Sequence, residues 1–522
     1  MELSEVERER LSKLDRLRAA GIDPYPPRCR FVHQRVMAAD AVQRALEAAQ
    51  RAMDGETADA AEVAVMGRVV ARRVMGKAAF LGIEDASGRV QVYGRVGEDS
   101  LNADAFALFK ELDLGDFIEA KGVPFVTKTG EPSLRVTDWG LLAKSLSPLP
   151  LAKEEKLPDG RLVRHSAFSD PELRYRQRYV DLAVNPEVRQ IFIMRAAIVK
   201  AIRAFLDDKG FLEVETPILQ PIYGGAAARP FITYHNQLDQ NLYLRISFEL
   251  YLKRLIVGNL ERVYEIGRDF RNEGVSFKHN PEFTQLEFYA AYMDMYAVMD
   301  LVEEMLQHVA RRVLPAEANG VTQFRGHLIN WLQPFQRVKL RDALLERTGI
   351  DYLQFPDRRS LADEVLRRRL MPPEVVHGKP WGKIVDGLIG DHVEKTLVQP
   401  TFLYEYPRDI SPFAKSVPGS PNLVERFELF VGGVELGNAF SELNDPLDQR
   451  QRFLDEAINA DAEEANPVDE DYVRALMYGM PATGGFGLGI DRLVMMFTNR
   501  DSIREVLLFP MLRREEGIKA SP

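Results

Sequence analysis

The chain has 522 residues, and 46% of them are hydrophobic. That length corresponds to roughly three domains, and that composition suffices for packed cores. The formal net charge of −10 argues against a protein that coats nucleic acid non-specifically, because such proteins rely on Lys and Arg contacts to phosphate. The single cysteine, Cys29, excludes an internal disulfide framework and a thiolate metal cluster, and it favours a reducing compartment.

The sequence has no leader-like or membrane-spanning segment. Met1 is followed by charged residues, whereas a secretory leader would continue into an apolar run. No uninterrupted apolar stretch reaches the ~20 residues that a transmembrane helix needs. We therefore expect a soluble, cytoplasmic protein with no membrane partner.

A helical extension is predicted over residues 1–58. Residues 2–20 are charged but place Leu11, Leu14 and Leu17 on one stripe, as an amphipathic helix does. A second helical stretch covers residues 38–53. We expect this helix to pack on the domain that follows it.

Five strands are predicted next, at 63–74, 78–84, 89–95, 116–126 and 132–138, with a helical segment near 102–111 between the third and the fourth. This order fits an OB-fold barrel over residues 59–146, a fold whose strand face commonly binds single-stranded nucleic acid. Local basic residues are available for RNA at Arg68, Arg72, Arg73 and Lys77. Residues 147–172, rich in Pro, Lys, Glu and Gly, are predicted to form a linker.

A long helix is expected to begin at Asn185 and Pro186, which are preferred cap and first-turn residues. Its apolar stripe is Ile191, Met194, Ile198, Ile202 and Phe205, and it ends at Gly210. The strand FLEVETP follows at 211–217, and then the Gly/Ala-rich loop PIYGGAAARPF at 221–231. Small residues in such a loop let the backbone approach a ligand closely.

Residues 262–289 are predicted to form two strands joined by a charged loop. Glu265, Asp269, Arg271 and Glu273 alternate onto one face of the first strand, and Phe283, Gln285, Glu287 and Tyr289 onto one face of the second. A face that mixes charged and aromatic residues is typical of a recognition surface. By periodicity alone, a solvated hairpin with a basic loop fits equally well.

The last third of the chain supplies two more polar strands. Residues 300–400 are helix-rich and carry no recognisable chemistry. Strands at 423–431 and 434–443, joined by Gly432 and Gly433, carry Glu428 and Glu435. Two carboxylates on neighbouring strands suit Mg²⁺ that is shared with nucleotide phosphates. The string GGFGLGIDRLVMMF at 484–497 is a glycine-alternating strand that runs into a helix, with Arg492 near the helix start.

Several of these segments together resemble one enzyme family. Phe-Arg-Asn-Glu at 270–273, followed by His279 and Phe283, resembles motif 2 of the class II aminoacyl-tRNA synthetases, and RNEGVSFKHNPEFT is similar to the version in lysyl-tRNA synthetases. Residues 187–217 resemble motif 1, and residues 484–497 resemble motif 3. The resemblance extends from about residue 60 to about 513. It implies an α+β protein, with the OB-fold barrel followed over 173–517 by a class II catalytic domain, an antiparallel sheet with flanking helices and a helical insertion at about 300–400.

The resemblance also assigns roles in nucleotide chemistry. Arg271 and Arg492 would be catalytic, Arg271 bridging the α-phosphate of ATP and the amino-acid carboxylate, and Arg492 holding the outer phosphates with His279. Phe283 would stack on adenine and Glu273 would contact its amino edge. Glu428 and Glu435 would hold Mg²⁺, with Glu428 also in the ATP site. Motif 1 would build a homodimer.

An acidic pocket is implied for the amino acid. Glu287, Glu442 and Tyr289 would receive the ε-ammonium of L-lysine, and Glu249 its α-ammonium. The backbone of Gly225 and the side chains of Asn438 and Phe440 would complete the lysine site.

The resemblance implies a tRNA partner for the barrel. MGKAAF, GRVQVY and TKTGE are similar to segments of the lysyl-tRNA synthetase anticodon-binding domain and imply a U-rich anticodon, that of tRNA(Lys). Phe80 would stack on a base, Gln91 and Glu131 would read base edges, and Arg73 would take a phosphate or a base face.

The implied reaction is ligation of lysine to tRNA(Lys), through a lysyl-adenylate formed from ATP. Three alternatives share parts of this equipment: an aspartyl- or asparaginyl-tRNA synthetase, a ligase that attaches lysine to a protein, and an inactive RNA-binding scaffold. The acidic pocket argues against the first, and the predicted barrel against the second. The presence together of Arg271, Glu273, Glu428, Glu435 and Arg492 argues against the third.

Overall fold

A computed structural model describes residues 3–55, 61–151, 153–156, 162–165, 168–459 and 467–513. The chain divides into two compact units, Met1–Arg174 and Tyr175–Pro522. The predicted boundary at 58/59, part of the predicted linker and the predicted domain end at 517 lie outside the described residues. Among the helices of the described ranges, none combines the length and the apolar character needed to cross a membrane.

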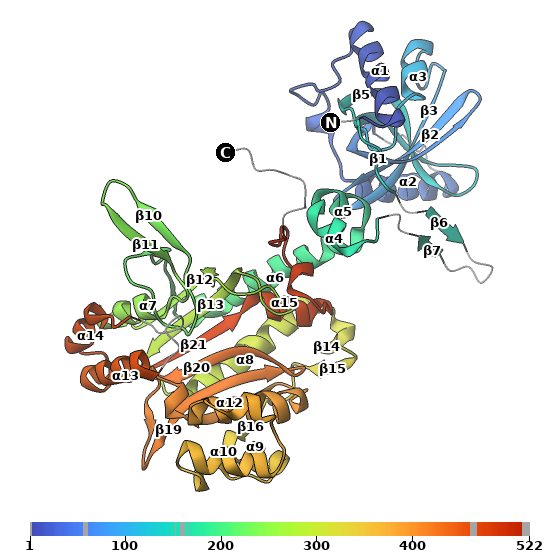
Figure 1. Ribbon diagram of the computed structural model, residues 1–522. Helices are drawn as coiled ribbons and strands as arrows, with labels where there is room; N and C mark the ends of the chain where they lie inside the picture. The colour runs from blue at the N-terminus through green and yellow to red at the C-terminus, as the bar shows by residue number, and fades with distance from the viewer. Residues whose placement is uncertain are drawn as a thin grey trace. The chain divides into compact units, whose positions relative to one another are not determined.

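The first unit contains a closed five-stranded barrel (Figure 1), which confirms the predicted OB-fold architecture. The strands pair in the order β1-β2-β3-β5-β4, and all pairs are antiparallel except β3 with β5. Alternate residues point inward and form one apolar core. The strands are β1 (Val63–Met75), β2 (Ala78–Asp85), β3 (Gly88–Arg95), β4 (Phe117–Val126) and β5 (Pro132–Ala143).

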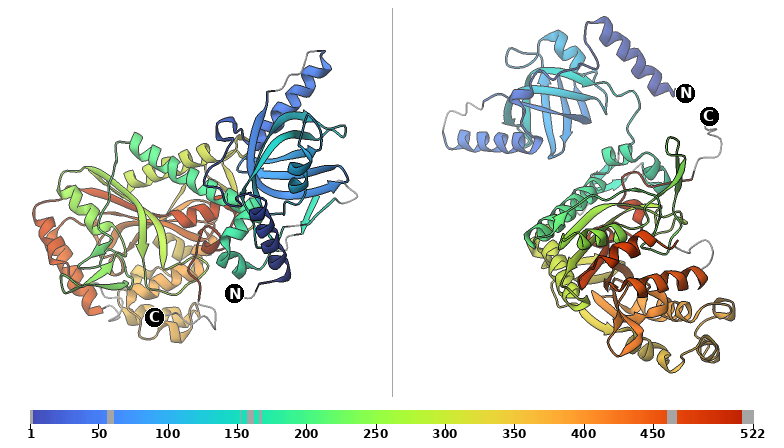
Figure 2. Two further views of the ribbon diagram at one scale, coloured as in Figure 1. Left: turned by 90° about the horizontal axis from the view of Figure 1, so that it is seen from above. Right: turned by 90° about the vertical axis from the view of Figure 1, so that its left-hand side faces the viewer.

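Three helices accompany the barrel: α1 (Glu5–Ala19), α2 (Ala38–Met53) and α3 (Ala103–Phe109). Helix α2 packs against β3, β4 and β5, as expected (Figure 2). It buries alanines spaced three or four residues apart. Helix α1 begins with a capping box between Ser4 and Glu7. The buried Arg10 ties α1 to this unit by donating to the carbonyl oxygens of Leu114, Ser145 and Ser147.

The second unit is built on a sheet of nine strands. Eight follow one path, β16-β17-β19-β20-β21-β13-β12-β8, and β18 pairs with β19. The central strands are antiparallel, whereas β16 and β8 pair in parallel at the two edges. The strands are β8 (Leu212–Glu213), β12 (Arg262–Phe270), β13 (Glu282–Ala291), β16 (Gln336–Lys339), β17 (Thr401–Pro407), β18 (Ser416–Val417), β19 (Ser420–Val431), β20 (Val434–Ser441) and β21 (Thr483–Gly489).

Helices cover this sheet and leave polar residues of its central strands for a site. Helices α6, α8 and α15 pack with the sheet in the largest core, which contains Leu286, Phe288, Phe486 and Leu488 (Figure 1). Helices α9, α10 and α12 form another core with β17 and β19. The helices of this region are α4 (Pro171–Arg176), α5 (Arg178–Val184), α6 (Pro186–Asp208), α7 (Glu249–Val257), α8 (Met295–Val313), α9 (Leu340–Thr348), α10 (Arg358–Arg367), α11 (Pro373–Val376), α12 (Trp381–His392), α13 (Pro446–Asn459), α14 (Glu470–Met477) and α15 (Ile490–Thr498).

The local structure differs from the predictions, or adds to them, at several places. The segment 300–400 contains helices, but it also contains a hairpin, β14 (Val321–Phe324) with β15 (His327–Asn330), and the strand β16. The strand predicted over 211–217 is only two residues long. Asn185 is the N-cap residue of α6 and Pro186 its first residue, as predicted, but the Asn185 side chain donates to Asp181 and makes no cap hydrogen bond. Within the predicted linker, β6 (Lys153–Lys156) pairs with β7 (Leu162–His165). A three-stranded sheet of β9 (Leu219–Gln220), β10 (Ile232–His235) and β11 (Gln240–Leu244) follows α6.

Candidate active site

The predicted recognition hairpin is formed by β12 and β13. Their register places Glu265 opposite Glu287 and Asp269 opposite Phe283, so these side chains share one face. Tyr264, Leu286 and Phe288 turn to the opposite face and enter the core. Period-2 alternation thus separates a polar face from a core face, as the sequence predicts.

Arg271 lies directly after β12, beside the aromatic ring of Phe283. Its guanidinium carbon is 5.0 Å from the ring centroid, and its Nε donates to the carbonyl oxygen of Ile246 at 3.4 Å. A planar guanidinium and a phenyl ring at this distance form a cation–π contact. The pair offers a positive charge for an anion and an aromatic surface at the start of the same loop. In that loop Glu273 is exposed, and its backbone N–H donates to the carbonyl oxygen of Arg271 at 2.9 Å.

Glu287 lies buried in a network of neutral donors. Its Oε1 accepts from the Ser247 hydroxyl at 2.8 Å and from Gln285 Nε2 at 3.0 Å, and its Oε2 accepts from the Tyr289 hydroxyl at 3.1 Å. Burial, reinforced by the carboxylates of Asp269 and Glu249, raises the pKa of Glu287 to about 8. The carboxylate is therefore well placed to gain from a cationic ligand.

Two more buried carboxylates, Glu249 and Glu442, share one lysine. Lys253 Nζ donates to Glu249 Oε1 at 2.6 Å and forms an ion pair with Glu442 Oε2. Neither oxygen of Glu442 makes a hydrogen bond of normal geometry within the described residues. Burial raises the pKa of Glu442 to about 8 and also raises the pKa of Glu249, although Lys253 opposes both shifts. Unsatisfied buried acceptors of this kind favour a ligand that donates.

Gly225 connects the Gly/Ala-rich loop to this acidic pocket. Its φ is +89°, and a Cβ on it would lie 3.1 Å from both Glu249 Cβ and Ser247 Oγ. A side chain there would be strained and crowded at once. The backbone of Gly225 therefore lies directly against the residues that hold Glu249 and Glu287.

The alternating glycines of β21, the strand of the predicted motif 3, leave room for side chains of the neighbouring strands. β21 lies between β13 and β20, with Phe486 and Leu488 in the core. A Cβ on Gly485 would overlap Glu442 Oε1 and the ring of Tyr289, and a Cβ on Gly487 would lie 2.9 Å from Gln285 Nε2. The acidic side chains of the neighbouring strands thus lie over a strand that has no side chains of its own on that face.

Glu428 and Glu435, the predicted metal pair, each have a cationic partner. Arg426 Nη2 donates to Glu428 Oε1 at 2.5 Å, and Arg492 Nη1 donates to Glu435 Oε2 at 3.1 Å. Burial raises the pKa of Glu428 to about 7, with Arg426 opposing and Glu435 adding to the shift. For Glu435, burial alone would raise the pKa, but Arg492 and Arg426 lower it below the usual range. The two carboxylates therefore influence each other and lie amid arginines.

His279 joins this group through Arg492. Arg492 Nη2 lies 3.4 Å from His279 Nε2, and His279 Nδ1 lies 2.9 Å from the Ser276 hydroxyl. Burial, together with the charges of Arg492 and Lys278, lowers the pKa of His279 to about 4. The imidazole is therefore neutral at physiological pH, so His279 can offer a hydrogen bond but no full charge.

Asn438 and Phe440 are held by Arg426, a residue that the sequence interpretation missed. Asn438 Oδ1 accepts from Arg426 Nε at 3.0 Å, and the ring of Phe440 lies 5.8 Å from the Arg426 guanidinium. Arg426 also donates to Glu428 and, through Nη1, to the carbonyl oxygen of Ile410 at 2.8 Å. The only sequence signal was its place two residues before Glu428, on the same face of a strand. Other missed members of the site are Lys253, Ser247 and Tyr406.

The predicted anticodon residues gather on one face of the barrel. Arg73 lies opposite Phe80 in the β1–β2 register, with its guanidinium 5.0 Å from the Phe80 ring. The Phe80 ring is 4.9 Å from that of Tyr93, which in turn is 5.9 Å from Phe125. These three rings form a row, of which the sequence interpretation identified only Phe80.

The polar residues of this face belong to β3 and β5. Gln91 Nε2 donates to the Ser133 hydroxyl at 2.8 Å, and Ser133 donates to the carbonyl oxygen of Glu131 at 3.1 Å. Glu131 is exposed at the β4–β5 turn, and its backbone N–H donates to Thr127 Oγ1. Phe80 thus belongs to a partly exposed aromatic row. Arg73 lies against its ring, Gln91 lies two residues before Tyr93 on the same face of β3, and Glu131 lies at the turn before β5.

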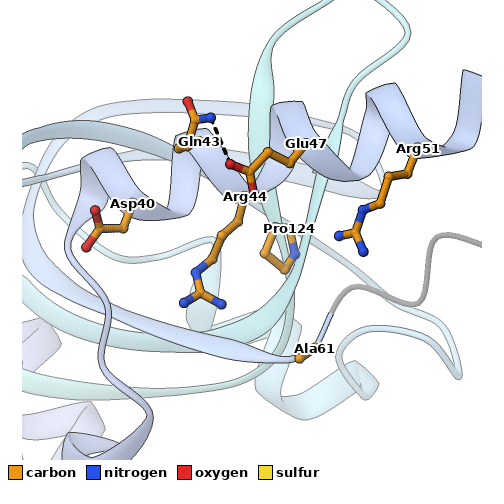
Figure 3. Close-up of a pocket in the computed structure, with 7 residues that line it drawn as sticks. All are labelled: Asp40, Gln43, Arg44, Glu47, Arg51, Ala61 and Pro124. Carbon is orange, nitrogen blue, oxygen red and sulfur yellow. Dashed lines mark hydrogen bonds between the residues drawn. The ribbon is translucent and has the colours of Figure 1, made fainter.

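A separate surface groove lies on α2 and contains none of the predicted site residues (Figure 3). Asp40, Gln43, Arg44, Glu47 and Arg51 line it from the helix, with Ala61 and Pro124 opposite. Gln43 donates to Glu47 at 2.9 Å. The charged residues of the groove have both signs, so the groove offers no preference for an anion or a cation.

Comparison with known proteins agrees with this geometry. Residues 170–513 match the family model of class II tRNA synthetases (D, K and N), and residues 63–142 match an OB-fold nucleic acid binding domain. Similar curated proteins include the lysine–tRNA ligase of Roseiflexus castenholzii, 51% identical over 99% of this chain and all of that protein. The lysine–tRNA ligases of Carboxydothermus hydrogenoformans and Chloroflexus aurantiacus are 48% and 47% identical, each over 98% of this chain and 99% of its own length. The chain therefore belongs to the class II tRNA synthetases, in the lysine–tRNA ligase family.

Proposed function

We propose that this protein activates L-lysine with ATP to form lysyl-adenylate and pyrophosphate, and then transfers lysine to the 3′ end of tRNA(Lys). The observation that carries the proposal is the acidic pocket of Glu249, Glu287 and Glu442, buried close to the loop of Arg271. An amino acid with two ammonium groups supplies the charge that such a pocket lacks. Its carboxylate is then free to face Arg271.

In the first step, a carboxylate oxygen of lysine attacks the α-phosphorus of ATP. The bond from that phosphorus to the bridging oxygen breaks, and pyrophosphate leaves with the electron pair. Two anions must come together, so positioning and charge stabilisation do most of the work. Arg271 contacts both the lysine carboxylate and the α-phosphate, and no side chain acts as a nucleophile.

The remaining nucleotide contacts follow from the same loop and from α15. Arg492 and His279 hold the outer phosphates, Arg492 by charge and the neutral His279 by a hydrogen bond. Phe283 stacks on adenine, and Glu273 accepts from its amino group. The contact of Arg271 with Phe283 supports this arrangement, because it brings the phosphate-binding charge and the base platform together.

Glu428 and Glu435 are suited to Mg²⁺. Within the described residues no group of three or more His, Cys, Asp or Glu side chains forms a metal cage, and Mg²⁺ that bridges ATP phosphates needs only one or two protein carboxylates. The raised pKa of Glu428, caused by burial and by Glu435, supports a cation here. Bound Mg²⁺ would neutralise phosphate charge, while Arg426 and Tyr406 orient Glu428.

Lysine specificity rests on buried charge. Glu287 and Glu442, with Tyr289, receive the ε-ammonium, Glu249 receives the α-ammonium, and Gly225, Asn438 and Phe440 complete the walls. A site built to pair with a terminal polar group rejects an analogue without it by roughly 10⁴-fold or more, since the site's own groups stay unpaired. Aspartate and asparagine have no ε-ammonium and would leave Glu287 and Glu442 without a cationic ligand, which disfavours the aspartyl and asparaginyl alternatives.

In the second step, a ribose hydroxyl of the terminal tRNA nucleotide attacks the lysyl carbonyl, and AMP leaves. The barrel supplies tRNA selection, with Phe80 stacking on an anticodon base, Gln91 and Glu131 reading base edges, and Arg73 contacting a phosphate or a base face. The row of partly exposed rings supports base stacking. It also favours tRNA as the acceptor over a protein.

The decisive experiment is amino-acid-dependent ATP–pyrophosphate exchange with Mg²⁺, comparing lysine, aspartate, asparagine and no amino acid. We expect exchange with lysine alone, followed by charging of tRNA(Lys) transcript. Exchange with aspartate or asparagine would contradict the lysine assignment. Exchange with none of them would favour the scaffold alternative, and lysine exchange without tRNA charging would favour a protein acceptor.

The proposal includes a homodimer in the cytoplasm, where tRNA is charged. Apolar side chains are more than a third exposed on α6 and on strands β8, β9 and β10, namely Ile193, Leu212, Leu219, Ile232 and Tyr234. Exposed apolar residues concentrated on motif 1 and on the strands after it support self-association. Sedimentation equilibrium would test this, and a monomer at micromolar concentration would contradict it.

A further inference from the structure

Lys253 is a completely buried cation inside the acidic pocket. It lies on α7 one turn after Glu249, with its side chain 0% exposed. The groups around it come from four other parts of the catalytic unit: Glu442 after β20, Tyr289 on β13, Tyr472 on α14 and Phe413. Its Nζ lies 5.9 Å from the Tyr289 ring and 5.1 Å from the Phe413 ring. Tyr472 is equally buried, and its hydroxyl has no hydrogen-bond partner among the described residues.

Such a lysine costs stability unless its partners compensate it. A buried ammonium loses its hydration and is retained only where carboxylates lie close. Lys253 has two, Glu249 at 2.6 Å and Glu442, each with its side chain at most 5% exposed. Burial alone would lower the pKa of Lys253, but the two carboxylates raise it above its usual value, so the lysine stays charged.

The two ion pairs of Lys253 do not neutralise all the negative charge of the pocket. One ammonium neutralises one of the two carboxylates that it contacts. Among the described residues, the donors to Glu287 are all neutral: the side chains of Ser247, Gln285 and Tyr289 and the backbone N–H of Phe248. The wall of Glu249, Glu287 and Glu442 is therefore left with two uncompensated negative charges when all three are ionised. Free lysine carries two ammonium groups. Asp269 and Glu265 do not enter this count, because both lie against the buried Arg245, at 3.4 and 2.6 Å, and Arg271 also acts on Asp269.

We infer that Lys253 is a built-in cation of the amino-acid pocket, a positioning residue that sets the number of free carboxylate charges to match a dicationic amino acid. It fixes Glu249 and Glu442 by one ion pair each and leaves an acceptor lone pair on each for the ligand. Lys253 itself does not contact the reacting atoms. This inference rests on the proposed function, since it assigns the residue to the lysine site of that reaction.

The fit of Lys253 depends on its neighbours leaving room. Gly485 lets Glu442 and Tyr289 lie over β21, and Gly225 lets the loop pass over Glu249. Arg426 acts on Glu249 from β19, and Arg254 acts on Tyr472. Because these cations belong to other partners, Lys253 is the cation in direct contact with both Glu249 and Glu442 within the described residues.

The test is steady-state ATP–pyrophosphate exchange with Lys253→Met, measured against lysine and against ATP. Removing the cation leaves three carboxylates close together, so one of them takes up a proton and no longer attracts an ammonium. We expect the KM for lysine at pH 7 to rise at least about tenfold (~1.4 kcal/mol), with the KM for ATP within about twofold of the wild type. In Lys253→Met the KM for lysine should also fall as the pH rises, and this fall should occur at a more alkaline pH than in the wild type.

Lys339→Met is the matched control. Lys339 also pairs with a glutamate, Glu405, at 2.8 Å, but at an exposed edge strand. Loss of that ion pair should leave both KM values unchanged. A lysine KM that stays within twofold of the wild type in Lys253→Met, or an equal rise in the KM values for lysine and ATP, would overturn the inference.

A double variant separates charge from packing. Lys253→Met/Glu442→Gln removes one cation and one carboxylate, and so restores the count of free negative charges. If Lys253 acts by charge, the loss of lysine affinity in the double variant is smaller than the product of the two single losses, whereas independent structural effects multiply. If Lys253→Met does not fold, a folded double variant with lysine-dependent exchange supports the inference, and a double variant that also fails to fold overturns it.

The wild type distinguishes the two proposals. Absence of lysine-dependent exchange in the wild type would overturn the proposed function, and this inference with it. Normal exchange in the wild type with an unaffected Lys253→Met variant would overturn this inference alone.

Discussion

At the scale of single residues, Glu287 is the carboxylate on which the proposed recognition of lysine depends most. Its partners are hydroxyl and amide donors, so replacement by glutamine preserves its shape but leaves the pocket without its least compensated charge. We expect Glu287→Gln to lower lysine-dependent exchange at least about 100-fold, which corresponds to roughly 2.7 kcal/mol for one charged contact. ATP binding, measured by calorimetry, should stay within threefold of the wild type. Normal turnover with lysine in this variant would remove Glu287 from recognition.

The same residue predicts a pH dependence. Because burial and the neighbouring Asp269 and Glu249 raise its pKa to about 8, Glu287 is largely protonated at pH 6.5 and becomes charged as the pH rises. A protonated carboxyl does not attract an ammonium, so the KM for lysine should fall between pH 6.5 and 8.5 while the KM for ATP changes less. In Glu287→Gln this fall should become shallower. A wild-type lysine KM that is constant over this range would contradict the charge assignment.

At the scale of elements, the glycine-alternating strand β21 makes the pocket possible. A methyl group at Gly485 would overlap Glu442 and Tyr289, both buried and both in the proposed lysine site. Gly485→Ala should therefore displace these side chains and raise the KM for lysine at least tenfold. The strain should cost about 1–3 kcal/mol of unfolding free energy, measured by denaturant titration.

Gly390→Ala is the control for that substitution. Gly390 lies inside α12, where an added methyl group meets ordinary contact distance, 3.8 Å from Glu394 Oε1. Alanine favours helix more than glycine does by about 1 kcal/mol, so this variant should be as stable as the wild type or more so. Equal effects of the two substitutions would mean that Gly485 has no special role.

How far the sequence predicts these elements depends on the range of their interactions. The barrel strands and the hairpin β12–β13 follow from local alternation, which is strong because each strand has one apolar face. Strand β16 was missed because its four residues, QRVK, carry no such pattern and pair with β17 from a distant part of the chain. Lys253 was missed for a related reason. Glu and Lys four residues apart usually form an exposed helix pair, and only the packing of α7 against β13 and α14 makes this one buried.

At the scale of the whole molecule, the proposed function divides the reaction between the two units. The residues proposed to bind lysine and ATP all belong to the unit Tyr175–Pro522, whereas the aromatic row belongs to Met1–Arg174. Adenylate formation needs no tRNA, so a change in the barrel should spare the first step and weaken only the second. This separation provides a test that does not depend on how the units are arranged.

Phe80→Ala is the substitution that applies this test. It removes the ring between Arg73 and Tyr93. Loss of one base–aromatic stack costs about 1–3 kcal/mol, so the KM for tRNA(Lys) in charging should rise about 5- to 150-fold. ATP–pyrophosphate exchange should stay unchanged. The control is Phe117→Ala, which removes a similar pair on β4, where the Arg68 guanidinium lies 4.3 Å from the ring. Within the described residues no ring contact joins this pair to the row of Phe80, Tyr93 and Phe125, so charging should be normal. If Phe80→Ala lowered exchange and charging together, the ring would be serving the stability of the barrel, and base recognition would have to lie elsewhere on its surface.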